Sequence, residues 1–517
     1  MKKTLSFFLA FTMVLGLISC TQKKEVEIME FLTTSKAVIN LIDSIEIASL
    51  ETVSMIDAAY SEYLSLSNTE KEEVSNYAKL EKLLSDTVKI LNPVEREGDR
   101  IDHTKINIGT YCYYFNDDYH AKELADAGID FVAAGNANTE YLEALHKYGI
   151  GVLVSAGAAG IPTWRVGDRP MDSVQPTPPF SMDDFRAALE NVQDHEAIWG
   201  FDIVDEPYGL DFPFYNDCAT AIREKFPHLI TYINLYPDVG ESRRLGSVDY
   251  QAHVNEFSEL VDVDYSCFDQ YMYRQSKELF KFLYSLKYHA AACDAKGRDL
   301  WSVIAVNSHI KDDQKIEDIP PLEVEQLQIQ AYIAMAFGAR VITWACWQPG
   351  WWVHNVYDSQ GQRSAQYEKL QSVNETIHRI SPIYMRYEYI DTCVLGRNVQ
   401  DTYEFRRIDD NIIHQDVFKN IQLSNECSLI VNGYYQQPNS NNVAMMFTNV
   451  SDHLLKESYN PPKVSISFEI DDSNAVVTAY HMGFPYRIYP ENGVYSFCFE
   501  NAEYVFVTVD YPTTTTE

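Results

Sequence analysis

The stretch Trp199-Gly-Phe-Asp-Ile-Val-Asp-Glu-Pro207 decides how the rest of the chain is interpreted. Its apolar residues predict a buried β-strand, which ends at Pro207 because proline cannot donate to a strand ladder. Side chains alternate between the two faces of a strand, so Asp202, Val204 and Glu206 are expected on one face. If that face lines a parallel barrel, Glu206 lies at the carboxyl mouth, where such barrels carry out their chemistry. A strand followed by an acidic loop is the alternative.

Strands and helices alternate from about residue 105 onward. Helical stretches such as 118–127 and 322–337 separate most of eight strand-like runs. This alternation predicts a parallel sheet, and eight units in about 275 residues fit a (β/α)8 TIM barrel over residues 105–384. A doubly wound open sheet is the alternative, although no glycine-rich turn follows the first strand. The expected strands are Ile106–Tyr113, Phe131–Gly135, Gly151–Ser155, Trp199–Glu206, Ile230–Leu235, Tyr265–Tyr271, Leu300–Val306 and Val341–Trp347.

The regions on either side of the barrel have different patterns. Residues 31–92 predict a module of three helices, the last preceded by a capping box at Ser67-Asn-Thr-Glu70. From residue 385 to 512, alternating runs separated by Asn, Pro, Gly and Asp predict an antiparallel β-sandwich. The expected fold class is therefore α/β, a TIM barrel with an N-terminal helical module and a C-terminal β-sandwich.

The first 20 residues have the features of an export signal. Two lysines precede an apolar run, Leu5–Ile18, and the segment ends in Leu17-Ile-Ser-Cys20. These four residues resemble a bacterial lipobox, which implies cleavage before Cys20 and attachment of lipid there. A plain signal peptide with an incidental cysteine is the alternative. With residues 21–30 as a tether, we expect a protein at the cell surface or in the periplasm, held to a bacterial membrane only by its lipid.

Net charge, aromatic content and cysteine spacing limit the classes of ligand and cofactor that the chain is expected to bind. The formal net charge of −34 argues against nucleic acid, because phosphate binding needs a basic patch. The 35 Tyr, 25 Phe and 7 Trp would suit neutral sugars, although most are expected in the core. No Cys-x-x-Cys or His-x-x-x-His spacing occurs, so neither a metal nor a cofactor is expected. Cys267 and Cys346 are expected to be buried thiols, and the other cysteines permit disulfides without assigning any.

A carboxylate before proline on strand 4, tryptophans after strand 8 and a C-terminal sandwich together resemble clan-A-type glycoside hydrolases. The run Gln330–Trp347 resembles the seventh helix and eighth strand of an uncharacterised bacterial lipoprotein branch of that group. The resemblance implies that Glu206 is the general acid/base. The residue before this acid is commonly Asn in the clan, and it is Asp205 in this chain. The clan's nucleophile, a Glu ending strand 7, has no counterpart, because that strand ends Ile304-Ala-Val-Asn-Ser-His309.

A second carboxylate must therefore be sought elsewhere. Glycoside hydrolysis ordinarily uses two, about 5 Å apart for retention and about 6.5–9.5 Å for inversion. Asp269, which ends strand 6, is the best candidate for a base or nucleophile, and a residue that only orients Glu206 is the alternative. Asp202, if charged and near Glu206, would raise the pKa of Glu206; the alternative is that Asp202 is a hydrogen-bonded aspartate of the core. We expect Trp344 in the core, and substrate-binding roles for Asp205, Asn136, Asn234, Tyr271, Trp347 and Trp351, with Tyr114, Trp352, Asn307 and His309 also near the mouth.

These patterns leave two functions open. The first is an extracytoplasmic, lipid-anchored glycoside hydrolase that acts on a neutral oligosaccharide or polysaccharide with Glu206 as the general acid. The second is a glycan-binding lipoprotein on a degenerate hydrolase barrel. The intact Asp205-Glu206-Pro207 end favours the enzyme, and the missing acid on strand 7 favours the binding protein.

Overall fold

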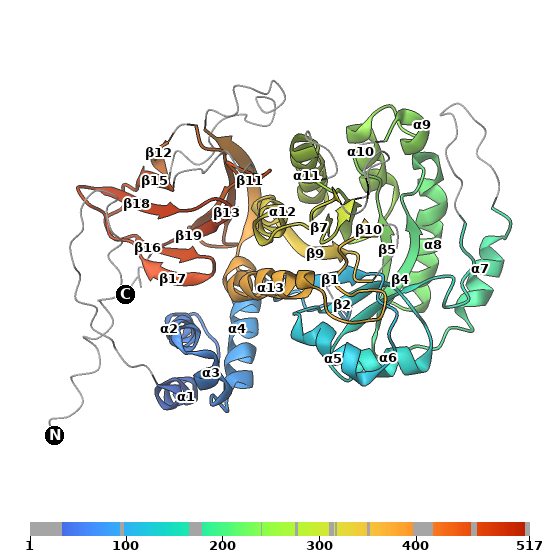
Figure 1. Ribbon diagram of the computed structural model, residues 1–517, viewed down its shortest axis with the longest axis horizontal. Helices are drawn as coiled ribbons and strands as arrows, with labels where there is room; N and C mark the ends of the chain where they lie inside the picture. Colours follow the sequence, from blue (N-terminus) through green and yellow to red (C-terminus); the bar gives the residue numbers. More distant parts are fainter. Residues whose placement is uncertain are drawn as a thin grey trace.

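The computed structural model describes the chain in ranges between residues 34 and 511. These are 34–93, 98–164, 178–238, 240–273, 278–309, 315, 318–348, 352–396, 417–425, 427–455 and 463–511. The expected signal peptide, the tether, Cys20 and Trp351 lie outside the described residues. Within the described ranges, short helices, a barrel and a β-sandwich follow one another along the chain (Figure 1).

The central part is a barrel of eight parallel strands. They pair in the order β5-β4-β3-β2-β1-β9-β7-β6, and a bridge between Leu235 and Phe268 joins the two edges. β1 and β9 pair from Asn107↔Val341 onward, so the predicted barrel, with its last strand beside its first, is confirmed. The strands are β1 (Asn107–Tyr111), β2 (Phe131–Gly135), β3 (Gly151–Ser155), β4 (Ile198–Asp205), β5 (Ile230–Asn234), β6 (Tyr265–Asp269), β7 (Asp299–Ala305) and β9 (Ala339–Ala345).

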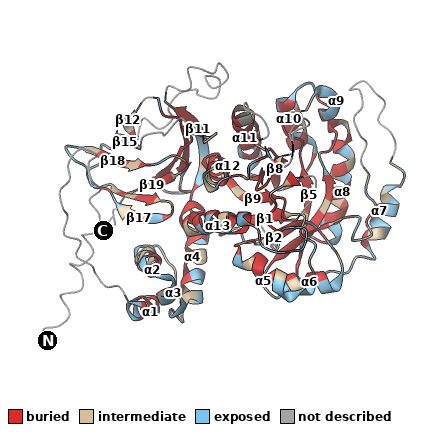
Figure 2. Cartoon of the chain, in the orientation of Figure 1, coloured by how far each residue is buried: buried red, intermediate tan, exposed pale blue. Residues whose placement is uncertain are grey.

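Helices surround the barrel and leave its strands buried (Figure 2). Aromatic rings fill the interior: Trp301 packs against Phe131, Tyr232 and Tyr265, with ring centroids 6.2, 5.9 and 4.4 Å away. Gly109 makes room for one of them, because a Cβ at that position would lie 2.3 Å from the Phe131 ring. The helices are α5 (Asp118–Asp126), α6 (Thr139–His146), α7 (Met182–Leu189), η1 (Gly209–Asp211), α8 (Phe212–Lys225), α9 (Ser242–Leu245), α10 (Tyr250–Leu260), α11 (Glu278–Lys296), α12 (Val324–Ala336) and α13 (Ala365–Tyr384).

The N-terminal helices differ from the expected three. The predicted third helix is split in two after Glu73, where Asn76 turns its side chain to α1 and donates to the Ile39 carbonyl at 3.0 Å. The predicted capping box at Ser67 and Glu70 is present and begins the first of the two. The helices are α1 (Ser35–Asp43), α2 (Val53–Ser65), α3 (Asn68–Glu72) and α4 (Tyr77–Leu91).

Two antiparallel sheets follow the barrel and share one apolar core, as predicted for a sandwich. α12 and α13 lie between them and the barrel (Figure 1), and Thr392 donates to the carbonyl of Ala336, the last residue of α12, at 2.8 Å. None of the helices within the described ranges combines the length and apolar character that crossing a bilayer requires. The first sheet comprises, in order, β11 (Glu388–Leu395), β13 (Ile430–Gln436), β14 (Val443–Asn449), β19 (Tyr504–Asp510), β16 (Val476–His481) and β17 (Phe484–Arg487). The second comprises β12 (Lys419–Leu423), β15 (Val464–Glu469) and β18 (Val494–Phe499).

Candidate active site

β4 carries acids to the carboxyl mouth of the barrel, but it does so through an irregular ladder. Its pairing with β5 shifts register between Asp202 and Val204. A shift of this kind inserts an extra residue and breaks the alternation of faces. The expectation that Asp202, Val204 and Glu206 share one face therefore fails across this shift, and the negative charge that raises the pKa of Asp202 is that of Asp205.

Asn234, the last residue of β5, ties three strands together at the mouth. Its Nδ2 donates to Oδ1 of Asp205 at 2.9 Å and to Oδ1 of Asp269 at 3.1 Å. Its backbone carbonyl accepts a hydrogen bond from the N–H of Glu206 at 2.8 Å. A single amide, itself 3% exposed, thus holds the ends of β4 and β6 beside one another. The predicted residues Asp205, Asn234 and Asp269 are brought together, with the backbone of Glu206.

The electrostatics of this cluster favour protons on its deeper acids. Burial, followed by the negative charges of Glu206 and Asp205, raises the pKa of Asp269 well above that of an exposed aspartate. Burial and the charge of Asp205 raise the pKa of Asp202 to about 8. No Lys, Arg or His within the described ranges forms an ion pair with Asp202, Asp205 or Asp269. Because none of the described cations pairs with these acids, like charges separate their proton affinities, as acid–base chemistry requires.

The backbone near the mouth is strained at several positions, among them the ends of β1 and β4. Glu206 has φ 51° and Cys112, which follows β1, has φ 62°. This left-handed conformation costs roughly 1–2 kcal/mol for residues other than glycine. Such strain persists only where the surrounding structure imposes it, and it concentrates at functional sites. The strain therefore marks the ends of β1 and β4 as parts of one site.

Tyr271 and Trp352 form a wall beside the acids. The side chain of Tyr271 hydrogen-bonds to Asp269, and its ring meets that of Trp352 edge-on, with centroids 4.5 Å apart. Trp352 lies in β10 (Trp352–Val353), which pairs with β8 (Ser308–His309). The ring of His309 also packs against Trp352, with centroids 4.4 Å apart. This two-stranded ribbon was not predicted from the sequence, because each of its strands has only two residues.

Trp347 does not line the mouth, so its predicted role as a sugar platform is wrong. Its ring is fully buried and packs edge-on against Tyr113, Tyr357 and Tyr367, with centroids 6.4, 5.4 and 6.0 Å away. A ring enclosed in this way has no face left for a ligand. Trp344 is in the core as expected, where its Nε1 donates to Asn374 at 2.9 Å.

Two predicted polar residues have local structural roles. Asn136 is exposed, and its Oδ1 accepts a hydrogen bond from the Asn138 N–H at 3.1 Å in the turn before α6. Asn307, beyond β7, clamps the backbone of Cys346: its Oδ1 accepts from the Cys346 N–H and its Nδ2 donates to the Cys346 carbonyl. The clan's nucleophilic Glu at the end of this strand thus has no counterpart at Asn307, as the sequence indicates.

Cys112 was not among the residues predicted for the site. Its side chain hydrogen-bonds to those of Cys346 and Tyr114, and its charge interacts with that of Asp205. The sequence could have indicated Cys112 through its position, because Cys112 and Cys346 follow the first and last strands, which are neighbours in a closed barrel. Both Cys267 and Cys346 are buried thiols, as predicted.

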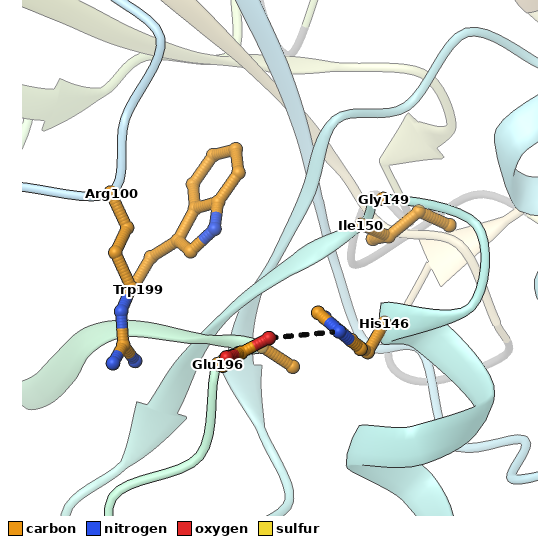
Figure 3. A pocket seen from close by; sticks show the side chains of 7 residues that line it. Arg100, His146, Gly149, Ile150, Glu196 and Trp199 are labelled. Carbon is orange, nitrogen blue, oxygen red and sulfur yellow. Dashed lines mark ion pairs between the residues drawn. The ribbon is translucent and has the colours of Figure 1, made fainter.

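A cavity of about 480 Å³ lies at the opposite, amino end of the barrel (Figure 3). His146 and Glu196 face one another across it, 3.3 Å apart. Most of its walls come from residues just before or at the start of β3 and β4, so it is remote from the acids at the carboxyl ends. The lining residues are Arg100, His146, Gly149, Ile150, Glu196, Ala197 and Trp199. Within the described ranges, no group of His, Cys, Asp and Glu side chains is arranged to hold a metal ion.

Comparison with solved structures agrees with the fold. A catalytic mutant of a GH42 β-galactosidase from G. stearothermophilus aligns with TM-score 0.51 and 9% identity over 78% of this chain and 98% of that chain. Another structure of a GH42 β-galactosidase, Gan42B, aligns with TM-score 0.50 and 8% identity over the same shares. At such identities the likeness concerns the fold alone: the chain has a barrel like those of clan-A-type glycoside hydrolases.

A further match covers less of its partner. The chain spans 60% of a β-galactosidase from the psychrophilic Marinomonas ef1, with 53% of its own length, 9% identity and TM-score 0.37. No family model and no curated protein matches the sequence.

Proposed function

We propose that this protein is a glycoside hydrolase, with Glu206 as the general acid and Asp269 as the second carboxyl group. The observation that supports this assignment most directly concerns Asn234. Its side-chain amide donates to Asp269 and Asp205 at 3.1 and 2.9 Å, and its backbone carbonyl accepts from the Glu206 N–H. Two carboxyl groups at the mouth of a hydrolase-type barrel are the groups that glycosidic bond cleavage needs.

The charge of one carboxyl group affects the proton affinity of the other in a way that suits this chemistry. In the free protein the charge of Glu206 helps to keep the proton on Asp269. If the proton moves to Glu206, that charge disappears and Asp269 ionises more readily. The state with neutral Glu206 and ionised Asp269 is the one that can protonate a leaving group and activate water. The pair therefore titrates as a unit rather than as two independent acids.

The surroundings of the site favour a neutral glycan. An anionic sugar would meet Asp205, Glu206 and a chain with a net charge of −34. The Tyr271 ring, which is half-buried beside Trp352, offers an aromatic edge against which a sugar could pack. We place the protein outside the cytoplasm, held by lipid on Cys20. Labelling with radioactive palmitate should be lost in Cys20→Ala, and unchanged labelling would contradict the anchor.

The decisive experiment is Glu206→Gln, assayed on substrates with different leaving groups. Cleavage of unactivated oligosaccharides should fall by about 10²–10⁴-fold, the usual contribution of general acid catalysis. Nitrophenyl glycosides should be less affected, because their leaving group departs without protonation, and glycan binding should be retained. The matched control is Glu196→Gln at the amino end of the barrel, whose side chain is 83% exposed and which should keep full activity. Equal losses on both substrate classes would contradict the assigned role.

One observation favours the glycan-binding alternative. β7 ends without a carboxylate, and the Asn307 side chain that follows it is engaged with the Cys346 backbone. If the wild type binds a glycan but cleaves nothing across a broad panel of glycosides, the binding function stands and the hydrolase is wrong.

A further inference from the structure

Two thiols lie side by side at the mouth of the barrel. Cys112 follows β1 and Cys346 follows β9, and these two strands are paired neighbours. The chains stay together beyond the strands, because the Trp347 N–H donates to the Tyr111 carbonyl at 2.8 Å. The next N–H along, that of Gln348, donates to the carbonyl of Cys112 at 3.2 Å. The two cysteine side chains hydrogen-bond to one another.

Neighbouring groups hold both thiols in position. Asn307 fixes Cys346 through hydrogen bonds to both its N–H and its carbonyl. Cys112 adopts φ 62°, and its side chain also hydrogen-bonds to that of Tyr114. Strain that is imposed on a residue with a reactive side chain is an indication of function.

We propose that Cys112 and Cys346 are a redox-active dithiol pair, which exchanges with external disulfides to close a disulfide between the ends of β1 and β9. Adjacent strands lie about 4.8 Å apart, which is within the roughly 4.4–6.8 Å between Cα atoms that a disulfide spans. Cys112 is half-buried and within reach of a reagent, whereas Cys346 is only 4% exposed. This difference in access makes Cys112 the attacking sulfur and Cys346 the resolving one.

Electrostatics support the same order. The hydrogen bond from Cys346, aided by that from Tyr114, lowers the pKa of Cys112 to about 6. The bond to Cys112 and burial raise the pKa of Cys346, so Cys346 holds the proton that the two sulfurs share. The thiolate is the nucleophilic form of cysteine. At neutral pH the exposed member of the pair is therefore the one that is ready to react.

The exchange proceeds in two balanced steps. The Cys112 thiolate attacks one sulfur of an external disulfide, a mixed disulfide forms, and one external thiolate departs and takes up a proton. Cys346 then loses its proton, and its sulfur attacks that of Cys112 and displaces the second external thiolate. Two protein thiols are oxidised and one external disulfide is reduced to two thiols. This redox role is independent of the proposed hydrolase activity, because neither step involves a glycan.

The test uses the full-length protein with oxidised glutathione as the probe, followed by non-reducing peptide mapping by mass spectrometry. A Cys427→Ser background removes an exposed thiol. The expected product is a peptide pair linked through Cys112 and Cys346, lighter by two hydrogen atoms and free of glutathione. In Cys346→Ser, glutathione should remain on Cys112, because nothing resolves the mixed disulfide. Cys218→Ser, which removes a buried thiol on α8, should behave like the parent.

Two outcomes would overturn the proposal. A parent protein that keeps glutathione on Cys112, as expected for Cys346→Ser alone, would show that Cys346 cannot reach the mixed disulfide. A parent protein in which Cys112 stays unmodified would show that its thiol is not reactive. Both outcomes are read from the parent protein, so they remain decisive if a serine variant does not fold.

Discussion

The two ends of the barrel differ in how their charges are arranged. At the amino end, Arg100 pairs with Asp194 at 3.0 Å and His146 with Glu196 at 3.3 Å around an open cavity. At the carboxyl end, Asp202 and Asp269 have raised pKa values and no cationic partner among the described residues. The cavity is thus at the end where charges are paired, and the acids that could do chemistry are at the other.

This contrast shows that the position of a cavity and the position of acids with shifted pKa values can point to different ends of the barrel. Paired charges near a surface add little to stability. Clustered acids without a cation destabilise the fold, and they are retained where their altered proton affinity is useful. The carboxyl end therefore has the properties of an active site, and the amino end those of a structural surface.

The largest effect that would sharpen the contrast is expected from Asp269→Asn. If Asp269 is the base or nucleophile, cleavage should fall by about 10²–10⁴-fold on every substrate, including those with good leaving groups. The measurement is kcat/KM on an oligosaccharide and on a nitrophenyl glycoside. A mild loss that appears only with poor leaving groups would show instead that Asp269 positions Glu206, since the amide can still accept the hydrogen bond from Asn234.

The strands of the barrel could be predicted from the sequence because each is a short apolar run bounded by turn residues. The predicted β2 and β3 agree with the structure at both ends, and the others differ by one or two residues at the ends. The bulge in β4 could not be foreseen, since it depends on the pairing with β5 and not on local composition. For that reason the shared face of Asp202, Val204 and Glu206 was predicted wrongly, although the acids themselves were named.

The site was harder to predict than the fold because an aromatic residue near a strand end can face either way. Trp347 and Trp352 lie five residues apart, yet the first is enclosed by three tyrosines and the second packs on Tyr271. Only the covering helix α13 and the β8–β10 ribbon decide between the two, and both are set by the tertiary structure.

Trp347→Ala tests whether the wall behind the mouth is structural. Removing a fully buried ring should lower the free energy of unfolding by about 3–5 kcal/mol, measured by chemical denaturation. Any glycan that the folded variant still binds should be bound with unchanged affinity, because the ring has no exposed face. If the variant kept its stability but lost glycan binding, Trp347 would be a ligand-binding residue after all.

Asp202→Asn tests the cost of the acid cluster through pH. An unfolded aspartate titrates near pH 3.9, whereas Asp202 in the folded protein has a pKa of about 8. Between these values the folded state binds more protons than the unfolded state, so this residue makes stability fall as pH rises. The variant, which has no proton to lose, should match the wild type near pH 4 and exceed it near pH 8.

The expected gain at pH 8 is on the order of 2 kcal/mol, below the roughly 5 kcal/mol to which the whole difference between the folded and unfolded pKa values corresponds. The reduction follows because the Asp202 side chain is only partly shielded from solvent. The measurement is urea denaturation of both proteins across the range from pH 4 to pH 8. Parallel stability curves would mean that Asp202 is already ionised without penalty, and Asp202 would then not belong to the group of acids with raised pKa values.

Trp199→Ala is the counterpart, at the amino end of the barrel, of Trp347→Ala. Of the substitutions described, it should change the free energy of unfolding least. Trp199 lies over Gly151, where a Cβ would come within 2.1 Å of its ring, and its ring centroid is 6.0 Å from that of Phe131. The ring is only partly buried and lines the open cavity. Its removal should therefore cost about 1 kcal/mol, well below the roughly 1.5–3 kcal/mol of a fully buried side chain. Glycan binding and cleavage should not change, because the acids lie at the other end of the barrel. If Trp199→Ala instead weakened glycan binding while unfolding normally in urea, the cavity at the amino end would be a ligand site, and the division between the two ends would be wrong.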